Sequence, residues 1–296
     1  MREKQEKDLQ PYSRTCIILY NNNRKFMYRE FFGLKEKPFN VTSDPNFLFF
    51  SRVHKEAFSH ILYGIKERKG FMEITGEIGA GKTTLCRAIL NQFDVNTKSA
   101  FIFNSNLPDL QLLQCILEDF GIVVTQKTKA SMLRQLNSFL LDELVKGNNV
   151  ILVIDEAQNL KSSTLEEIRM LSNLETDTQK LFQILLVGQP ELKEKINSPR
   201  LRQLKQRIAV RFHISALQKD EVERYIYHRL TVAGSKGDIL FTAEAMDFIF
   251  KFSGGIPRTI NMVCDKSLLS AYVSEAKTIT LPIVEKSAQE LEGIIL

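Results

Sequence analysis

The stretch Gly76-Glu-Ile-Gly-Ala-Gly-Lys82-Thr83, followed by Thr84, decides the fold of this chain. It fits the pattern G-x-x-x-x-G-K-[ST], with a strand candidate at 71–75 before it and helical periodicity at 82–93 after it. A strand, a glycine-rich loop and a helix in this order aim backbone N–H groups and a helix N-terminus at phosphate groups. The stretch is therefore predicted to be a phosphate-binding loop, called the P-loop below.

The P-loop predicts ATP with Mg²⁺ as the ligand. Lys82 is expected to reach the β- and γ-phosphates, and the hydroxyl of Thr83 is expected to bind magnesium. The residues expected to surround the nucleotide are Gly76, Glu77, Ile78, Gly79, Ala80, Gly81, Lys82, Thr83 and Thr84.

Two carboxylates follow the apolar run 150–154. A buried strand of a parallel sheet places the residues after its end beside the P-loop. Asp155 is predicted to hold magnesium, directly or through water, and Glu156 to orient and polarise the attacking water. An ordinary acidic turn is the alternative, but two adjacent carboxylates are costly without a cation. The pair favours hydrolysis over storage of the nucleotide.

Two further polar residues are placed to contact the γ-phosphate. Gln189 follows the apolar run 185–187, where it can contact the γ-phosphate or the attacking water, and a plain turn residue is the alternative interpretation. Arg258 follows Pro257 at the predicted start of a helix, where a cation opposes the helix dipole and needs a negative partner. The γ-phosphate is one such partner, and a local carboxylate is the other.

Residues 195–219 contain seven Lys or Arg and no acid. Three interpretations are open: a solvated helix face, a contact with nucleic acid, or an arginine that enters the site of a neighbouring subunit. We favour the third, in which a guanidinium neutralises charge in the transition state. Arg207 is the predicted residue, and Arg202 is the alternate.

The order of apolar and amphipathic segments predicts an α/β fold with a parallel sheet covered by helices on both faces. Expected strands are 71–75, 100–104, 150–154, 181–187 and 209–214. Expected helices are 53–68, 82–93, 108–120, 129–146, 162–175, 191–197, 218–233, 242–253 and 257–275, with 279–296 left open. The predicted domains are a polar tail (1–26), a P-loop core (27–215) and a small all-helical lid (216–296).

Composition excludes several classes of protein. The longest apolar runs have five residues, whereas a membrane helix needs roughly 20. The four cysteines are Cys16, Cys86, Cys115 and Cys264; they form no C-x-x-C pair, and we expect a cytoplasmic protein without structural zinc or disulfides. Residues 1–29 carry seven of the 40 basic and three of the 35 acidic residues, which leaves 33 against 32 in the body. A near-neutral body argues against a broad nucleic-acid surface.

Together these motifs resemble the AAA+ ATPases of the general secretion pathway protein A (ExeA/GspA-like) type. The resemblance runs from residue 27 to near the end of the chain. It rests on Met27-Tyr-Arg-Glu-Phe-Phe-Gly-Leu-Lys-Glu-Lys-Pro-Phe39, Asp44-Pro-Asn-Phe-Leu-Phe49, Lys69-Gly-Phe71, the P-loop, Asp155-Glu-Ala-Gln158, Gly188-Gln-Pro-Glu-Leu192, Gln206-Arg-Ile208 and Gly255-Ile-Pro-Arg258.

The resemblance implies a RecA-like core with a helical lid that acts as a homo-oligomer, either a ring or a filament. It also implies Walker A at 76–83, Walker B at 155–156, sensor one at Gln189, sensor two at Arg258 and an arginine finger at Arg207. Better-known relatives drive secretin assembly and carry a membrane span and a periplasmic peptidoglycan-binding domain, neither of which this sequence contains.

The leading hypothesis is an oligomeric AAA+ ATPase that remodels or recruits a protein partner, with a membrane-anchored partner placing it at the cytoplasmic side of an envelope system. A DNA-dependent ATPase of the transposition or replication-initiation kind is the alternative, although no helix-turn-helix or appended basic domain is recognisable. A switch that binds nucleotide with little turnover is a third hypothesis, and Glu156 argues against it.

Overall fold

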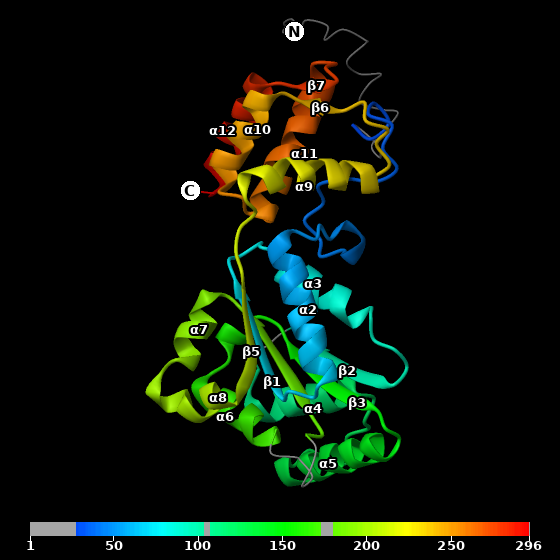
Figure 1. Ribbon diagram of the computed structural model, residues 1–296, viewed down its shortest axis with the longest axis vertical. Helices are drawn as coiled ribbons and strands as arrows, with labels where there is room; N and C mark the ends of the chain where they lie inside the picture. The colour runs from blue at the N-terminus through cyan, green and yellow to red at the C-terminus, as the bar shows by residue number, and fades with distance from the viewer. Residues whose placement is uncertain (1–27, 104–106, 173–179, 296) are drawn as a thin grey trace, which may run out of the picture. The chain divides into compact units, whose positions relative to one another are not determined.

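The computed structural model describes residues 28–103, 107–172 and 180–295 (Figure 1). Several predictions fall outside the described residues. They concern the tail with Cys16, the last residue of the strand expected at 100–104, and the end of the helix expected at 162–175. The chain divides into two compact units. Of the described residues, we call those within Val41–His228 and Phe250–Asn261 the sheet unit, and those within Met1–Asn40, Arg229–Ile249 and Met262–Leu296 the helical unit.

The sheet unit contains a five-stranded parallel sheet with the strand order β2-β3-β4-β1-β5. Its strands are β1 (Phe71–Gly76), β2 (Thr97–Ile102), β3 (Asn149–Ile154), β4 (Gln183–Gly188) and β5 (Ile208–Ile214). Every residue of β1 and β4 is buried, as expected for central strands covered on both faces, whereas burial alternates along the edge strand β5. All five predicted strands are present, which confirms the α/β fold.

Helices cover both faces of the sheet. One apolar cluster packs Met72, Ile74 and Leu185 against the helices that directly precede and follow β1 in the chain. A second cluster packs Phe71 and Leu186 against the later helices of the sheet unit. This alternation along β1 follows from the two-residue period of a strand. The helices are α2 (Arg52–Lys66), α3 (Lys82–Leu90), α4 (Asp109–Asp119), α5 (Lys129–Val145), α6 (Ser162–Leu171), α7 (Pro190–Ile196) and α8 (Arg202–Arg207).

The register of the three central strands brings their carboxyl ends together. Ile154 of β3 pairs with Leu186 of β4, and Gly188 of β4 pairs with Thr75 of β1. The segments that follow β3, β4 and β1 therefore leave the sheet at one edge, where α/β proteins build their sites. These segments are the predicted carboxylate pair, Gln189 and the P-loop.

The remaining helices are α9 (Lys219–Val232), α10 (Ala243–Ser253), α11 (Pro257–Val273) and α12 (Leu281–Ile295). They confirm a helical C-terminal region and show that most of the segment left open at 279–296 is a helix. A two-residue parallel ladder, β6 (Leu240–Phe241) with β7 (Thr278–Ile279), was not predicted. Among the described residues, no helix is both long enough and apolar enough to cross a bilayer.

Residues 28–40 belong to the helical unit. The hydroxyl of Tyr28 donates a hydrogen bond to Asp265, and the guanidinium of Arg229 donates to the carbonyls of Pro38 and Asn40. Arg229 is buried, so these bonds satisfy a cation that would otherwise be costly to bury. The grouping places residues 28–40 with helices of the predicted lid. The predicted domain boundaries, 27–215 for the core and 216–296 for the lid, stay a prediction.

Candidate functional site

The P-loop joins β1 to α3 in a conformation that only glycine adopts readily. Gly79 and Gly81 have φ values of 80° and 94°. Gly81 is also the N-cap of α3, and no side chain caps that helix. The first N–H groups of α3 lack a capping side chain, so the helix N-terminus is suited to bind an anion.

Lys82 is the first residue of α3, and its ammonium turns back onto the P-loop. Its Nζ donates to the carbonyl oxygens of Gly76 and Glu77 at 2.8 Å each. Burial lowers the pKa of Lys82, while the carboxylates of Glu156 and Asp155 act in the opposite direction. In this structure the ammonium donates its hydrogen bonds to loop carbonyls. Phosphate oxygens can take the place of these carbonyls as acceptors.

The carbonyls of Gly79 and Ala80 are also bound from outside the P-loop. The backbone N–H of Arg258 donates to Gly79 O at 3.2 Å, and the imidazole Nε2 of His54 lies 3.1 Å from Ala80 O. Both contacts lie within the sheet unit. Two loop carbonyls are therefore held by residues from outside the P-loop.

Thr83 and Asp155 contact each other directly. Thr83 Oγ1 donates to Asp155 Oδ2 at 2.6 Å, and the N–H of Glu156 donates to Asp155 Oδ1 at 2.9 Å. Burial raises the pKa of Asp155, and these two hydrogen bonds oppose that rise. The predicted magnesium ligands therefore lie within hydrogen-bond distance of each other.

The chemistry of this donor pair fits Mg²⁺. The described part of the chain contains no group of three or more His, Cys, Asp or Glu that would form a metal cage. Mg²⁺ usually takes one or two protein oxygens and completes its octahedron with water and phosphate oxygens. One hydroxyl and one carboxylate beside a phosphate-binding loop match that requirement.

Glu156 begins a 3₁₀ turn (Ala157–Asn159) in the left-handed conformation, with φ 51° and ψ 35°. A non-glycine residue in this region bears a cost of roughly 1–2 kcal/mol. Its Oε2 accepts from Gln158 Nε2 at 2.6 Å and from Gln189 Nε2 at 3.1 Å. The N–H of Gln189 donates to Gln158 Oε1 at 3.1 Å, which closes the network.

Gln158 was missed as a site residue in the sequence. It lies in Asp155-Glu-Ala-Gln158, two positions after the predicted base Glu156. This short spacing is the feature of the sequence that could have indicated a contact with the base. Gln189 contacts Glu156, the predicted base. Its role in catalysis stays a prediction.

The remaining P-loop positions differ in exposure. Glu77 is exposed, Ile78 is 56% exposed, and Thr84 in the first turn of α3 is half-buried. The start of α11 lies against the loop, because a Cβ added at Gly79 would meet Arg258 Cβ at 2.4 Å. The exposed side chain of Arg258 therefore starts beside the P-loop, and its pairing with the γ-phosphate stays a prediction.

Arg207 lies at the other edge of the sheet. It is the last residue of α8, directly before β5, and Ile208 pairs with Phe71 at the amino end of β1. Arg207 Nη1 donates to Ser172 Oγ at 3.0 Å, and the alternate Arg202 is exposed. The seven residues of β5 span about 20 Å. Arg207 is therefore remote from the P-loop of its own chain, and its action in a neighbour's site stays a prediction.

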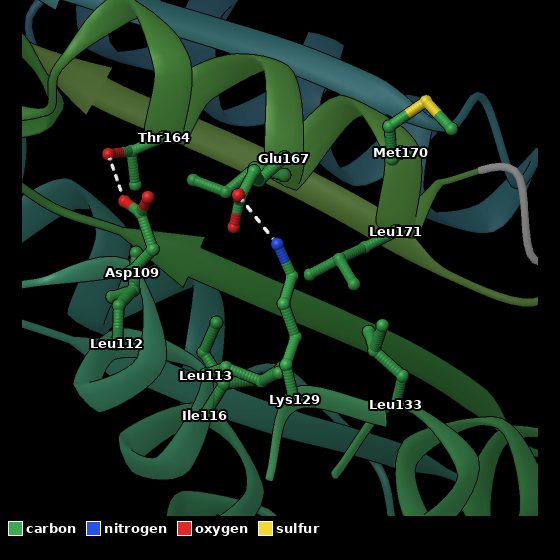
Figure 2. Close-up of a pocket in the computed structure, with 11 residues that line it drawn as sticks. Asp109, Leu112, Leu113, Ile116, Lys129, Leu133, Thr164, Glu167, Met170 and Leu171 are labelled. Carbon is green, nitrogen blue, oxygen red and sulfur yellow. Dashed lines mark hydrogen bonds and ion pairs between the residues drawn. The ribbon is translucent and has the colours of Figure 1, made fainter. Parts of the chain in front are cut away.

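A separate apolar pocket of about 400 Å³ lies between α4, α5 and α6 (Figure 2). Leucine and isoleucine side chains line it, and Figure 2 shows Lys129 reaching across it toward Glu167. These two side chains form an ion pair at 2.6 Å, and Thr164 donates to Asp109. The lining includes no residue of the P-loop or of the carboxylate pair, so the pocket is not part of the candidate site.

Comparisons with known proteins place an AAA domain within this chain. The family described as "AAA domain" matches residues 65–196, and this domain binds nucleotide. General secretion pathway protein A of Aeromonas hydrophila is 40% identical over 269 residues, which are 90% of this chain and 49% of that protein. The chain thus spans about half the length of this relative.

Solved structures of related fold include the Aeropyrum pernix ORC2 protein in its ADPNP–ADP complexes and Cdc6p from Pyrobaculum aerophilum. The first has a TM-score of 0.67 at 19% identity and covers 86% of this chain and 72% of its own. The second has a TM-score of 0.67 at 16% identity, with coverage of 86% and 70%. At these identities the likeness shows the P-loop AAA fold alone. The 40% identity over 90% of the chain, together with the AAA-domain match, makes this chain a GspA/ExeA-like AAA-domain protein.

Proposed function

We propose that this protein binds ATP with Mg²⁺ at the P-loop and hydrolyses it as a subunit of a homo-oligomer. One observation carries the proposal: Lys82, Thr83, Asp155 and Glu156 meet at the carboxyl edge of three adjacent strands. Thr83 and Asp155 lie 2.6 Å apart there, and the predicted base follows Asp155 directly. The match to the AAA family independently supports nucleotide binding.

Binding would exchange contacts inside the protein for contacts with phosphate. Lys82 Nζ would leave the carbonyls of Gly76 and Glu77 for phosphate oxygens, which offer a charged acceptor. The uncapped N-terminus of α3 would contribute its N–H groups and its dipole. Thr83 and Asp155 would hold Mg²⁺, which supplies positive charge to the phosphate oxygens.

Glu156 is the residue best placed to accept a proton from water. As the water oxygen bonds to the γ-phosphorus, Glu156 would take the proton, and the bond from the γ-phosphorus to the β–γ bridging oxygen would break. ADP and inorganic phosphate result. Gln158 and Gln189 hold the carboxylate of Glu156 in one orientation, and orientation is a large part of general base catalysis.

The position of Arg207 is compatible with an oligomer. Because this residue lies at the amino edge of the sheet, it would act on the site of an adjacent subunit in a ring or filament. An arginine supplied in this way contributes roughly 10³–10⁵ in rate in other P-loop enzymes. Arg202 is the exposed alternate in the same helix.

We infer a protein partner in a secretion or envelope-assembly system from the 40% identity to general secretion pathway protein A. The protein would work at the cytoplasmic side of that system through a membrane-anchored partner. DNA-dependent turnover is the second candidate, because Arg200, Arg202, Lys205 and Arg211 are all exposed. A basic surface of this kind is the usual footprint of a phosphate backbone.

The deciding experiment measures ATP hydrolysis against protein concentration, with and without Mg²⁺ and with and without duplex DNA. The proposal expects specific activity to rise with concentration, to require Mg²⁺ and to be indifferent to DNA. A specific activity independent of concentration would contradict the oligomeric mechanism. A large stimulation by DNA that disappears at high salt would favour the second candidate. Binding without hydrolysis under all conditions would make the protein a nucleotide switch.

A further inference from the structure

We propose that His54 is a positioning residue that holds the Ala80–Gly81 peptide in its phosphate-binding orientation. The inference rests on the proposed nucleotide site, and it assigns a role to a residue that none of the P-loop motifs includes. His54 lies in the first turn of α2, 26 residues before Ala80, and it is 3% exposed.

The hydrogen bonds of the imidazole define its tautomer. A carbonyl oxygen can only accept, so the Nε2 atom that lies 3.1 Å from Ala80 O must carry the proton. The other nitrogen, Nδ1, then accepts from the hydroxyl of Ser51 at 2.7 Å. Ser51 Oγ also accepts from the His54 N–H at 3.3 Å as the N-cap of α2. The ring is thus fixed from both sides.

The neutral form of the imidazole matches its surroundings. Burial lowers the pKa of His54, against the opposing effects of its bond to Ala80 and of the Glu221 carboxylate. Glu221 also accepts from the N–H of Arg52, next to Ser51, so it belongs to the same corner of the sheet unit. A neutral ring with Nε2–H therefore persists at neutral pH.

The bond to Ala80 determines where the next amide points. The C=O and N–H of a trans peptide point in opposite directions, and no cis peptide occurs among the described residues. With the Ala80 carbonyl turned to His54, the Gly81 N–H is directed to the opposite side. Gly81 sits at φ 94°, and a glycine can rotate this peptide at low cost. An external partner is needed to keep one orientation.

The packing of the ring against the loop is equally close. A Cβ added at Gly81 would come 3.1 Å from His54 Nε2, closer than nine in ten Cβ contacts in proteins. The imidazole thus occupies the space beside Gly81. His54 holds the loop both by this packing and by its hydrogen bond to Ala80. Preorganisation of this kind strengthens ligand binding without touching the ligand.

A matched pair of variants separates the two bonds of the ring. In His54→Gln the side-chain amide reaches the position of Nε2 and can still donate to Ala80 O. In His54→Asn the shorter side chain reaches the position of Nδ1, so it retains Ser51 and loses Ala80. We expect His54→Asn to raise the Kd for ATP and ADP about tenfold, the effect of one neutral hydrogen bond, and His54→Gln to stay near wild type. Their melting temperatures without nucleotide should agree.

Nitrogen NMR of the nucleotide-free wild-type protein tests the geometry independently of function. Protonated Nε2 with an accepting Nδ1 is expected, and the opposite tautomer would overturn the inference. Equal nucleotide affinity of both variants and wild type would also overturn it. If His54→Asn does not fold, Ser51→Ala serves as a milder variant that frees the ring. Wild type that binds no nucleotide would instead sink the proposed function, whatever the variants do.

Discussion

The hydroxyl of Thr83 donates a hydrogen bond to Asp155 Oδ2 at 2.6 Å, across 72 residues of sequence. The bond joins the first turn of α3 to the end of β3, so the P-loop and the carboxylate pair form one site. Both oxygens are ligands that Mg²⁺ prefers, and metal binding would have to replace this hydrogen bond.

Lys82→Ala should abolish nucleotide binding, because the ammonium is the main point charge on the phosphates. The same change should leave the nucleotide-free protein as stable as wild type or more so. Burial lowers the pKa of Lys82, which means that the charged form is disfavoured in the folded state. Calorimetric titration with ATP and a thermal melt measure the two effects. Wild-type affinity in this variant would rule out the P-loop assignment.

Glu156→Gln should bind ATP with Mg²⁺ at near wild-type affinity and lose turnover, because an amide cannot accept the proton of the attacking water. Single-turnover hydrolysis and nucleotide binding are measured on the same preparation. Gln158→Ala is a matched control, since it removes one hydrogen bond to Glu156 but keeps the base. We expect its rate to lie between those of wild type and Glu156→Gln. Near-normal hydrolysis by Glu156→Gln would place the base elsewhere.

Asp155→Asn should remove a pH-dependent component of stability from the nucleotide-free protein. Burial raises the pKa of Asp155, so between its unfolded and folded pKa values the folded state holds a proton that the unfolded chain has released. This contribution favours folding at low pH and is lost as pH rises through the folded pKa.

Melting temperatures of Asp155→Asn and wild type, measured from pH 4.5 to 7.5 without Mg²⁺, test this prediction. The variant should gain most over wild type at neutral pH, and the difference should shrink toward pH 4.5. The raised pKa of Glu73 is common to both proteins and cancels in the comparison. A gap between the two proteins that widens toward acid pH would contradict the assignment.

Gly79→Ala should weaken nucleotide binding and lower the melting temperature more than a control glycine does. A methyl group at residue 79 would meet Arg258 Cβ at 2.4 Å, so the loop or the start of α11 must move. Gly121 has a similar φ of 77°, and no atom lies within 4 Å of the position that a methyl group would take there, so Gly121→Ala bears the backbone strain alone. That strain is roughly 1–2 kcal/mol. Equal melting temperatures for the two variants would show that α11 does not confine the P-loop.

Arg207→Ala should bind ATP normally and hydrolyse it slowly, by roughly 10³–10⁵ if the guanidinium acts in a neighbour's site. Mixing it with Lys82→Ala should partly restore activity, because Lys82→Ala subunits still present Arg207 to an intact site. An arginine that acts within its own chain could not be rescued by mixing.

Ser172→Ala is the control for this experiment, since it removes the hydrogen-bond partner of Arg207 and keeps the guanidinium. It should retain activity and needs no rescue. Where differently labelled subunits are shown to mix, an absence of rescue would move the assignment to Arg202.

The amino-acid sequence alone determined the elements that depend on local pattern. The P-loop is a contiguous motif, and the runs 71–75 and 150–154 are mostly apolar, as expected of central parallel strands that are buried on both faces. The same reasoning located Asp155 and Glu156, since a residue that follows a central strand must leave the sheet at its carboxyl edge. The structure reproduces both strands to within one residue at each end.

Contacts between distant segments were decided only by the tertiary structure. The strand order β2-β3-β4-β1-β5 places Gln189 beside Glu156 and puts Arg207 at the opposite edge from the P-loop. The ladder of β6 with β7 has two residues in each strand, too few to show a period in the sequence. His54 meets Ala80 because α2 packs behind the loop, and no local pattern encodes that packing. Local periodicity specifies which face of an element is buried, whereas only the assembled core specifies what lies against it.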